Sequence, residues 1–271
     1  MGSPTLTRLQ RLLTPGATLI EPSSGNTGIG MAIVRRMRGY KLKVVLPRNV
    51  SIERRQLLEV WPAEIIDSPA NEGSNGAVRV AQQLASVHPE WTFLYEYGNP
   101  ADPRAHYEGT GPEIWRDCPE ITHFVAGLGT SGTLLGVGRF LKEANPQVQV
   151  WAVEPPAGET VEGLRNLDAG YIPPIFLEEG GEGLLDRKTV VGPRDSIEWT
   201  RRLADLGVFA GISSGAALAG AIKCAESIEQ GTVLFMCSDG GWKYVSTGAW
   251  TGEVDEVVER ARARSTSDVL G

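Results

Sequence analysis

The sequence predicts an α/β protein with two doubly wound parallel-sheet domains. Three observations support this prediction: short apolar runs alternate with stretches of helical periodicity from end to end, glycine-rich turns directly follow several of the runs, and 41% of the 271 residues are hydrophobic. Such alternation is typical of parallel strands joined by helices on both faces of a sheet. Ligands in these folds bind beyond the carboxyl ends of the strands, so the residues that follow each predicted strand are the candidates for function.

The predicted elements form two series. The first has strands at 17–20, 44–46, 64–66 and 92–95, with helices over 31–38, from Ser51 (a residue type that caps helix N-termini) and over 78–87. The second has strands at 122–126, 148–153, 207–212 and 233–236, with helices after Gly132, from about Asp195 and after Ser214. The turn at 98–103 separates the series, which predicts a smaller N-terminal domain of residues 1–97 and a larger C-terminal domain of residues 98–271.

Composition and charge exclude several classes of protein. Acidic residues outnumber basic ones by 33 to 26, for a net charge of −7, which argues against a partner that is nucleic acid or an anionic membrane. No apolar run is long enough to cross a bilayer. The three cysteines form no CxxC pair, so we expect a reduced, cytoplasmic location. The three histidines have no other ligands at metal-site spacing, and we predict no metal site.

The first candidate turn, SSGNTG at residues 23–28, lies between a predicted strand and a predicted helix. It places three hydroxyls and an amide among glycines at a helix N-terminus, where free N–H groups and the helix dipole attract a carboxylate or a phosphate. An ordinary helix cap is the alternative, but a cap needs only one hydroxyl.

The second candidate turn, GLGTSGT at residues 127–133, matches G-x-G-x-x-G between a strand and a helix, and Glu154 follows at the end of the next strand. This context is typical of dinucleotide binding, so an NAD-dependent oxidoreductase is one alternative for this chain. However, Thr130, Ser131 and Thr133 crowd the turn with hydroxyl donors, which favours a terminal phosphate monoester over a pyrophosphate. Two further turns follow later strands: GISSGAA at 211–217, where an N-cap serine is the simpler interpretation, and SDGGWKY at 238–244.

Taken in order, SSGNTG, GNPADPRAHYEGTGPEIW, GLGTSGT, AVEP, GISSGAA and SDGGWKYVSTGA resemble motifs of the pyridoxal-phosphate-dependent cysteine synthases, which have the tryptophan-synthase-β-like fold (fold type II). The resemblance runs from about Pro15 to about Gly252. Segments 51–56 and 163–168 are most similar to the O-phosphoserine sulfhydrylase and cysteine synthase B branch. In that branch a small thiocarboxylated carrier protein can supply sulfur.

The resemblance implies roles for particular residues. The cofactor phosphate would be held by Gly129, Thr130, Ser131, Gly132 and Thr133. Asn26 would bond the ring oxygen of pyridoxal 5'-phosphate, and Ser213 its pyridine nitrogen. The carboxylate of a small amino-acid substrate would be bound by Ser23, Ser24, Asn26 and Thr27. Arg165 would bind a substrate phosphate through its bidentate fork.

The sequence departs from the family at two chemically important places. Relatives carry their Schiff-base lysine in an S-x-K-D-R segment before the SSGNTG turn, whereas the first lysine here is Lys41, so we predict no catalytic lysine. This absence suggests either an N-terminally incomplete chain or a decayed paralogue. Glu96 stands where relatives place a glutamine near the substrate carboxylate, and the two like charges would repel.

The expected function is therefore cysteine biosynthesis by β-replacement on an activated serine, O-phosphoserine or O-acetylserine, in a homodimer as in the relatives. Turnover is expected to be slow or absent without the lysine. The alternatives are a catalytically inactive binding or scaffold subunit and the NAD-dependent oxidoreductase.

Overall fold

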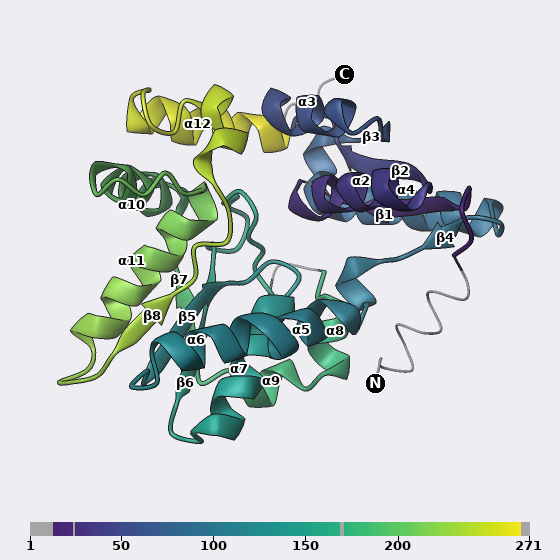
Figure 1. Ribbon diagram of the computed structural model, residues 1–271. Helices are drawn as coiled ribbons and strands as arrows, with labels where there is room; N and C mark the ends of the chain where they lie inside the picture. Colours follow the sequence, from purple (N-terminus) through teal and green to yellow (C-terminus); the bar gives the residue numbers. More distant parts are fainter. Residues whose placement is uncertain (1–12, 24, 169–170, 267–271) are drawn as a thin grey trace. The chain divides into compact units, whose positions relative to one another are not determined.

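The computed structural model describes residues 13–23, 25–168 and 171–266, and the chain divides into two units. The N-terminal unit extends to Tyr95, and the C-terminal unit spans Glu96–Arg264. Each unit contains a four-stranded parallel sheet with helices on both faces (Figure 1), which confirms the predicted fold class. The boundary expected between residues 97 and 98 falls inside the short helix η2 (Glu96–Gly98). No helix in the described part of the chain is long and apolar enough to span a membrane.

The sheet of the N-terminal unit has the strand order β3-β2-β1-β4. Its elements are β1 (Thr18–Pro22), α2 (Asn26–Arg38), β2 (Lys41–Pro47), α3 (Ile52–Val60), β3 (Glu64–Ser68), η1 (Ala70–Glu72), α4 (Gly73–Val87) and β4 (Thr92–Phe93). Side chains that alternate along β1 and β2 point to opposite faces. Leu19 and Val44 pack with α2 and α3, whereas Ile20 and Val45 pack against α4.

The sheet of the C-terminal unit repeats this order as β7-β6-β5-β8. Its elements are η2, α5 (Ala101–Ala105), the π-helical turn η3 (His106–Thr110), α6 (Gly111–Asp117), β5 (His123–Gly127), α7 (Gly132–Ala144), β6 (Gln149–Glu154), α8 (Pro174–Glu178), α9 (Gly181–Leu184), β7 (Arg187–Val190), α10 (Pro193–Asp205), α11 (Ile212–Glu226), β8 (Val233–Phe235), η4 (Gly241–Lys243), η5 (Val245–Thr247) and α12 (Val254–Thr266).

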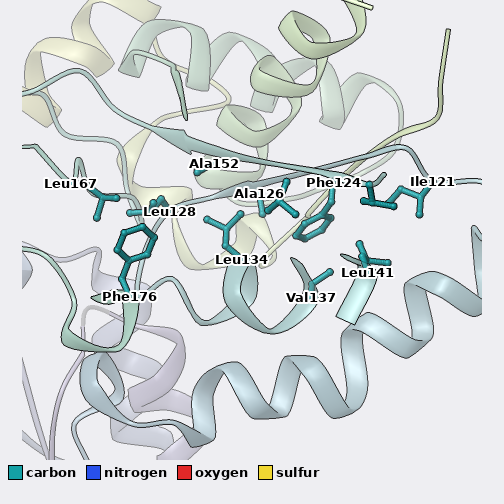
Figure 2. Packing of buried hydrophobic residues seen from close by; sticks show 12 residues of the cluster. Ile121, Phe124, Ala126, Leu128, Leu134, Val137, Leu141, Ala152, Leu167 and Phe176 are labelled. Carbon is teal, nitrogen blue, oxygen red and sulfur yellow. The ribbon is translucent and has the colours of Figure 1, made fainter. Parts of the chain in front are cut away.

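The core of the C-terminal unit consists of two layers separated by the sheet. In one layer, shown in Figure 2, Phe124 and Ala126 of β5 pack against Leu134, Val137 and Leu141 of α7. In the other layer, the intervening residue of β5, Val125, packs with α11. This alternation fixes α7 and α11 on opposite faces of the sheet, and both helices begin beyond the carboxyl ends of the strands.

Two predicted strands differ from the structure. Residues 207–211 form a loop with one bridge, Ala210 to Gly240, because Gly207 adopts a positive φ of 83° that turns the chain after α10, and Ile212 begins α11. The strand expected at 92–95 ends at Phe93, since Tyr95 has a φ of 52° and donates its backbone N–H to the Glu21 carboxylate at 2.7 Å.

Candidate functional site

Each sheet has a topological switch point that positions one of the candidate turns. In the N-terminal unit the strand order reverses between β1 and β4, and in the C-terminal unit it reverses between β5 and β8. The carboxyl ends of strands at such points line the ligand crevice of open α/β sheets. The SSGNTG turn follows β1, and the GLGTSGT turn follows β5.

The turn after β1 is organised by the hydroxyl of Ser23, which is 5% exposed. Its Oγ accepts the backbone N–H of Gly25 at 3.1 Å and of Gly28 at 2.9 Å. Asn26 and Thr27 form the first turn of α2, with Asn26 exposed and Thr27 half-buried. Ser24 lies outside the described residues. The first N–H groups of α2 have no partner within their own helix, which suits a carboxylate ligand.

A buried arginine, which the sequence analysis did not identify, lies beneath this turn. Arg54 is 3% exposed, and its Nε donates to the Ser51 hydroxyl at 2.8 Å. A Cβ at Gly25 would lie 2.9 Å from Arg54 Cδ, so the arginine stem packs directly against the turn. Its guanidinium therefore adds positive charge next to the helix N-terminus.

The hydroxyl groups of the turn after β5 form hydrogen bonds within the turn and to the segment at 102–106. Ser131 is the N-cap of α7 and adopts a left-handed φ of 80°, which turns the chain sharply at the helix N-terminus. The Thr130 hydroxyl accepts the Gly132 N–H at 3.3 Å and donates to the Asp102 carboxylate at 2.7 Å. The Ser131 hydroxyl donates to the Thr130 carbonyl. The Thr133 hydroxyl shares a 3.1 Å hydrogen bond with Nε2 of His106.

Two glycines at this turn lie too close to neighbouring atoms to carry a side chain. A Cβ at Gly129 would lie 2.9 Å from the Gly163 carbonyl, and one at Gly132 would lie 2.1 Å from the Asp102 carboxylate. The absence of side chains there allows the Gly163 carbonyl and the Asp102 carboxylate to approach the start of α7 closely.

Ser213 joins the same edge of the C-terminal sheet. It lies in the first turn of α11 and is 6% exposed. A Cβ at Gly163, where φ is +83°, would lie 3.7 Å from the Ser213 hydroxyl. Gly163 thus separates the Gly129 turn on one side from Ser213 on the other, so the structure brings these two predicted cofactor contacts together.

Arg165 lies close to the same turn and is held in place. Its backbone N–H donates to the Leu128 carbonyl at 2.8 Å. Its guanidinium carbon lies 4.8 Å from the ring centre of Tyr97 and 5.0 Å from that of Tyr171, and Nη1 donates to the Tyr171 carbonyl at 3.2 Å. Glu96, the neighbour of Tyr97, is half-buried. The structure therefore fixes Arg165 in orientation near the turn after β5.

The six lysines of the chain differ in environment, and none precedes residue 41. Lys243 is buried at 5% exposure and its ammonium pairs with Asp239 at 2.8 Å, while Asp239 also accepts the Tyr244 hydroxyl at 2.6 Å. Lys188 lies in β7 and pairs with Glu154 at 3.3 Å.

Glu154, the acidic residue of the dinucleotide alternative, is engaged inside its own unit. It is 2% exposed, and besides Lys188 it accepts the Leu167 N–H at 3.1 Å. Its carboxylate therefore anchors the loop after β6. A ribose hydroxyl would have to displace these partners, which disfavours dinucleotide binding.

The residues of the C-terminal unit fit a phosphorylated pyridine. The turn offers backbone N–H groups at a helix N-terminus without a side chain at either Gly129 or Gly132, and the nearby Ser213 supplies a neutral hydroxyl. Ser23, Asn26 and Thr27 belong to the other unit. Asp102, His106 and Gly163 were not identified as site residues from the sequence, because only the folded chain brings them to the turn.

The chain is similar in sequence and in fold to known proteins. Residues 3–239 match the family model described as pyridoxal-phosphate dependent enzyme. The chain is 38% identical over 243 residues to cysteine synthase B of Escherichia coli, and the match covers 89% of this chain and 78% of the relative. It is also 38% identical to cysteine synthase of Aquifex aeolicus, where the match covers 89% of this chain and 75% of the relative. Two solved structures are also similar. One is O-ureido-L-serine synthase, with a TM-score of 0.81 and 35% identity, where the match covers 92% of this chain and 80% of the other. The other is an O-acetylserine-dependent cystathionine β-synthase from Helicobacter pylori, with a TM-score of 0.83 and 32% identity, where the match covers 91% of this chain and 82% of the other.

Proposed function

The chain belongs to the pyridoxal-phosphate-dependent enzyme family, and we propose that it is a cysteine-synthase-type enzyme that acts by β-replacement on an activated serine. The observation that carries the proposal is the convergence of the Gly129–Thr133 turn and Ser213 at one edge of the C-terminal sheet, separated by Gly163.

In this proposal the turn after β5 holds the cofactor phosphate, and pyridoxal phosphate, when bound, supplies the electron sink that elimination at the β-carbon requires. The N–H groups of the first turn of α7 bind the phosphate oxygens. Ser213 accepts or donates one neutral hydrogen bond at the pyridine nitrogen. A neutral partner leaves the ring less electron-withdrawing than a carboxylate partner would, which suits β-elimination.

On the substrate side, we assign the amino-acid carboxylate to the N-terminus of α2, where Asn26, Thr27 and the turn organised by Ser23 would bind it. The buried guanidinium of Arg54 favours an anion at that turn. We assign Arg165 to the phosphate of O-phosphoserine, because its planar fork is already oriented by Tyr97 and Tyr171.

Six lysines are present, and the one buried among them, Lys243, is engaged with Asp239. We therefore propose that Lys243 does not bind the cofactor covalently. The sulfur donor is sulfide or a thiocarboxylated carrier protein, and the working assembly is a homodimer.

Titration with pyridoxal phosphate, followed by absorbance and tryptophan fluorescence, tests the proposal. Ser213→Ala should weaken binding about three- to ten-fold, the effect of one neutral hydrogen bond. Ser227→Ala, at the other end of α11, is the matched control and should change nothing. Equal affinity in wild type and Ser213→Ala, or binding of NADH in place of pyridoxal phosphate, would refute the assignment.

Two further measurements separate the parts of the proposal. Borohydride reduction and mass spectrometry should find Lys243 unmodified, and an adduct on Lys243 would contradict this assignment. Cysteine formation should be compared with O-phosphoserine and O-acetylserine, each with sulfide or a thiocarboxylated carrier. Arg165→Lys should reduce use of O-phosphoserine more than use of O-acetylserine.

A further inference from the structure

A carboxylate lies against the turn that we assign to the cofactor phosphate. Asp102, the second residue of α5, accepts the Thr130 hydroxyl at 2.7 Å, and its carboxylate would collide with a Cβ placed on Gly132. A phosphate dianion bound at this helix N-terminus would therefore be close to a half-buried anion. The two anions would also compete for the same threonine hydroxyl.

His106 makes the corresponding contact to the second threonine of the turn. Its Nε2 lies 3.1 Å from the Thr133 hydroxyl and 3.9 Å from the Asp102 carboxylate, while its Nδ1 lies 3.0 Å from the Thr110 hydroxyl. Burial lowers the pKa of His106, which favours the neutral imidazole. If the neutral imidazole donates from Nε2 to the Thr133 oxygen, the Thr133 hydroxyl can donate its own hydrogen to a ligand. The Thr130 hydroxyl instead donates its hydrogen to the Asp102 carboxylate.

The other charged groups of the surrounding elements have partners elsewhere. On α5 and η3, Arg104 pairs with Glu108, and on α7 the charged side chains pair outside the turn: Arg139 with Glu179, Lys142 with Asp186, and Glu143 with the Tyr107 hydroxyl. Among the described titratable groups on these elements, His106 is therefore the one that faces Asp102. Burial raises the pKa of Asp102, and the hydrogen bond from Thr130 opposes this only in part.

We propose that Asp102 is a positioning residue that couples phosphate binding at the Gly129–Thr133 turn to the uptake of one proton. The inference rests on the proposed function, because it requires a phosphate at this turn. Without phosphate, the Asp102 carboxylate accepts the Thr130 hydroxyl. When phosphate binds, one proton from solvent adds to Asp102. The carboxyl O–H then donates to Thr130 Oγ1, and the Thr130 hydrogen turns to the phosphate.

The affinity for inorganic phosphate and for pyridoxine phosphate, which cannot condense with an amine, tests this coupling. Asp102→Asn mimics the protonated carboxyl and should bind both probes about ten-fold more tightly than wild type at mildly alkaline pH, or ~1.4 kcal/mol. The ratio should fall toward one at acidic pH, where Asp102 is already neutral. The titration of the phosphate itself cancels in the ratio. Asp205→Asn, an exposed change of the same charge, should give a ratio of one at every pH.

Calorimetry on the wild-type protein in buffers of different ionisation enthalpy provides a second measurement that needs no Asp102 variant. At mildly alkaline pH, where phosphate is already a dianion, binding should take up about one proton. A ratio that does not change with pH, or no proton uptake by the wild type, would overturn the coupling while leaving the phosphate site intact. If no variant binds either probe, the proposed function itself fails.

Discussion

The close approach of α7 to α5 and η3 leads to a sharp prediction about Gly136. A Cβ at this position would lie 2.1 Å from the Pro103 carbonyl oxygen, 2.6 Å from His106 Cβ and 2.8 Å from the backbone nitrogen of Tyr107. Ordinary contact begins at 3.4 Å, so the two layers must separate by about 1.3 Å, the difference between 3.4 and 2.1. Two of the three atoms belong to the backbone, and no side-chain rotation relieves the overlap.

Gly136→Ala should therefore lower the free energy of unfolding of the C-terminal unit by ~1–3 kcal/mol through overpacking, reduced by up to about 1 kcal/mol from the better helix propensity of alanine. Gly183→Ala is the matched control in the same unit, because nothing lies within 4 Å of its Cβ. Urea unfolding of both variants measures the effect. If Gly136→Ala is as stable as Gly183→Ala, the described packing of α7 against η3 is wrong.

Three other changes test different parts of the structure. Leu134→Ala removes a fully buried side chain and should lower the free energy of unfolding in urea by ~2–5 kcal/mol, whereas Leu177→Ala at an exposed position should change it by less than about 0.5 kcal/mol. Similar losses in both variants would contradict the core assignment. Burial lowers the pKa of His106 in the folded state. Below the pKa of the unfolded state, near 6.5, the unfolded chain therefore binds more protons, and the free energy of unfolding decreases as the pH is lowered. Thermal midpoints of His106→Gln should therefore fall less than those of wild type on acidification, and parallel curves would show that His106 does not titrate in this way. Glu96→Gln should tighten amino-acid binding, by at most about three orders of magnitude if the two carboxylates lie ~4 Å apart at an effective dielectric of ~20; unchanged affinity in a substrate titration would show that Glu96 does not face the substrate.

Local patterns in the sequence predicted the elements that bury alternating side chains. The run predicted as a strand at 122–126 corresponds to β5, whose apolar residues pack in both core layers. The hydroxyl-rich turn after β5 leads into α7, as expected. Boundaries were predicted less well where a single residue changes the chain direction. Gly207 follows α10 and has a positive φ, which turns the chain. The apolar residues after it therefore form a loop with one bridge.

Contacts between distant segments could not be predicted from local sequence. Ser51 does precede a helix, as expected, but its hydroxyl accepts from buried Arg54 and makes no cap bond. Asp102 and His106 lie on a helical segment well before the turn after β5, and nothing in their spacing indicates that they meet Thr130 and Thr133. The sequence therefore predicted the turn between a strand and a helix but not the carboxylate beside it.

A crystal structure of the protein with pyridoxal phosphate tests the central claim most directly. We expect phosphate density within hydrogen-bonding distance of the backbone nitrogens of Gly132 and Thr133, with the pyridine nitrogen next to the Ser213 hydroxyl. Phosphate density at any other place on the chain, or a ring nitrogen bound by a different side chain, would contradict it.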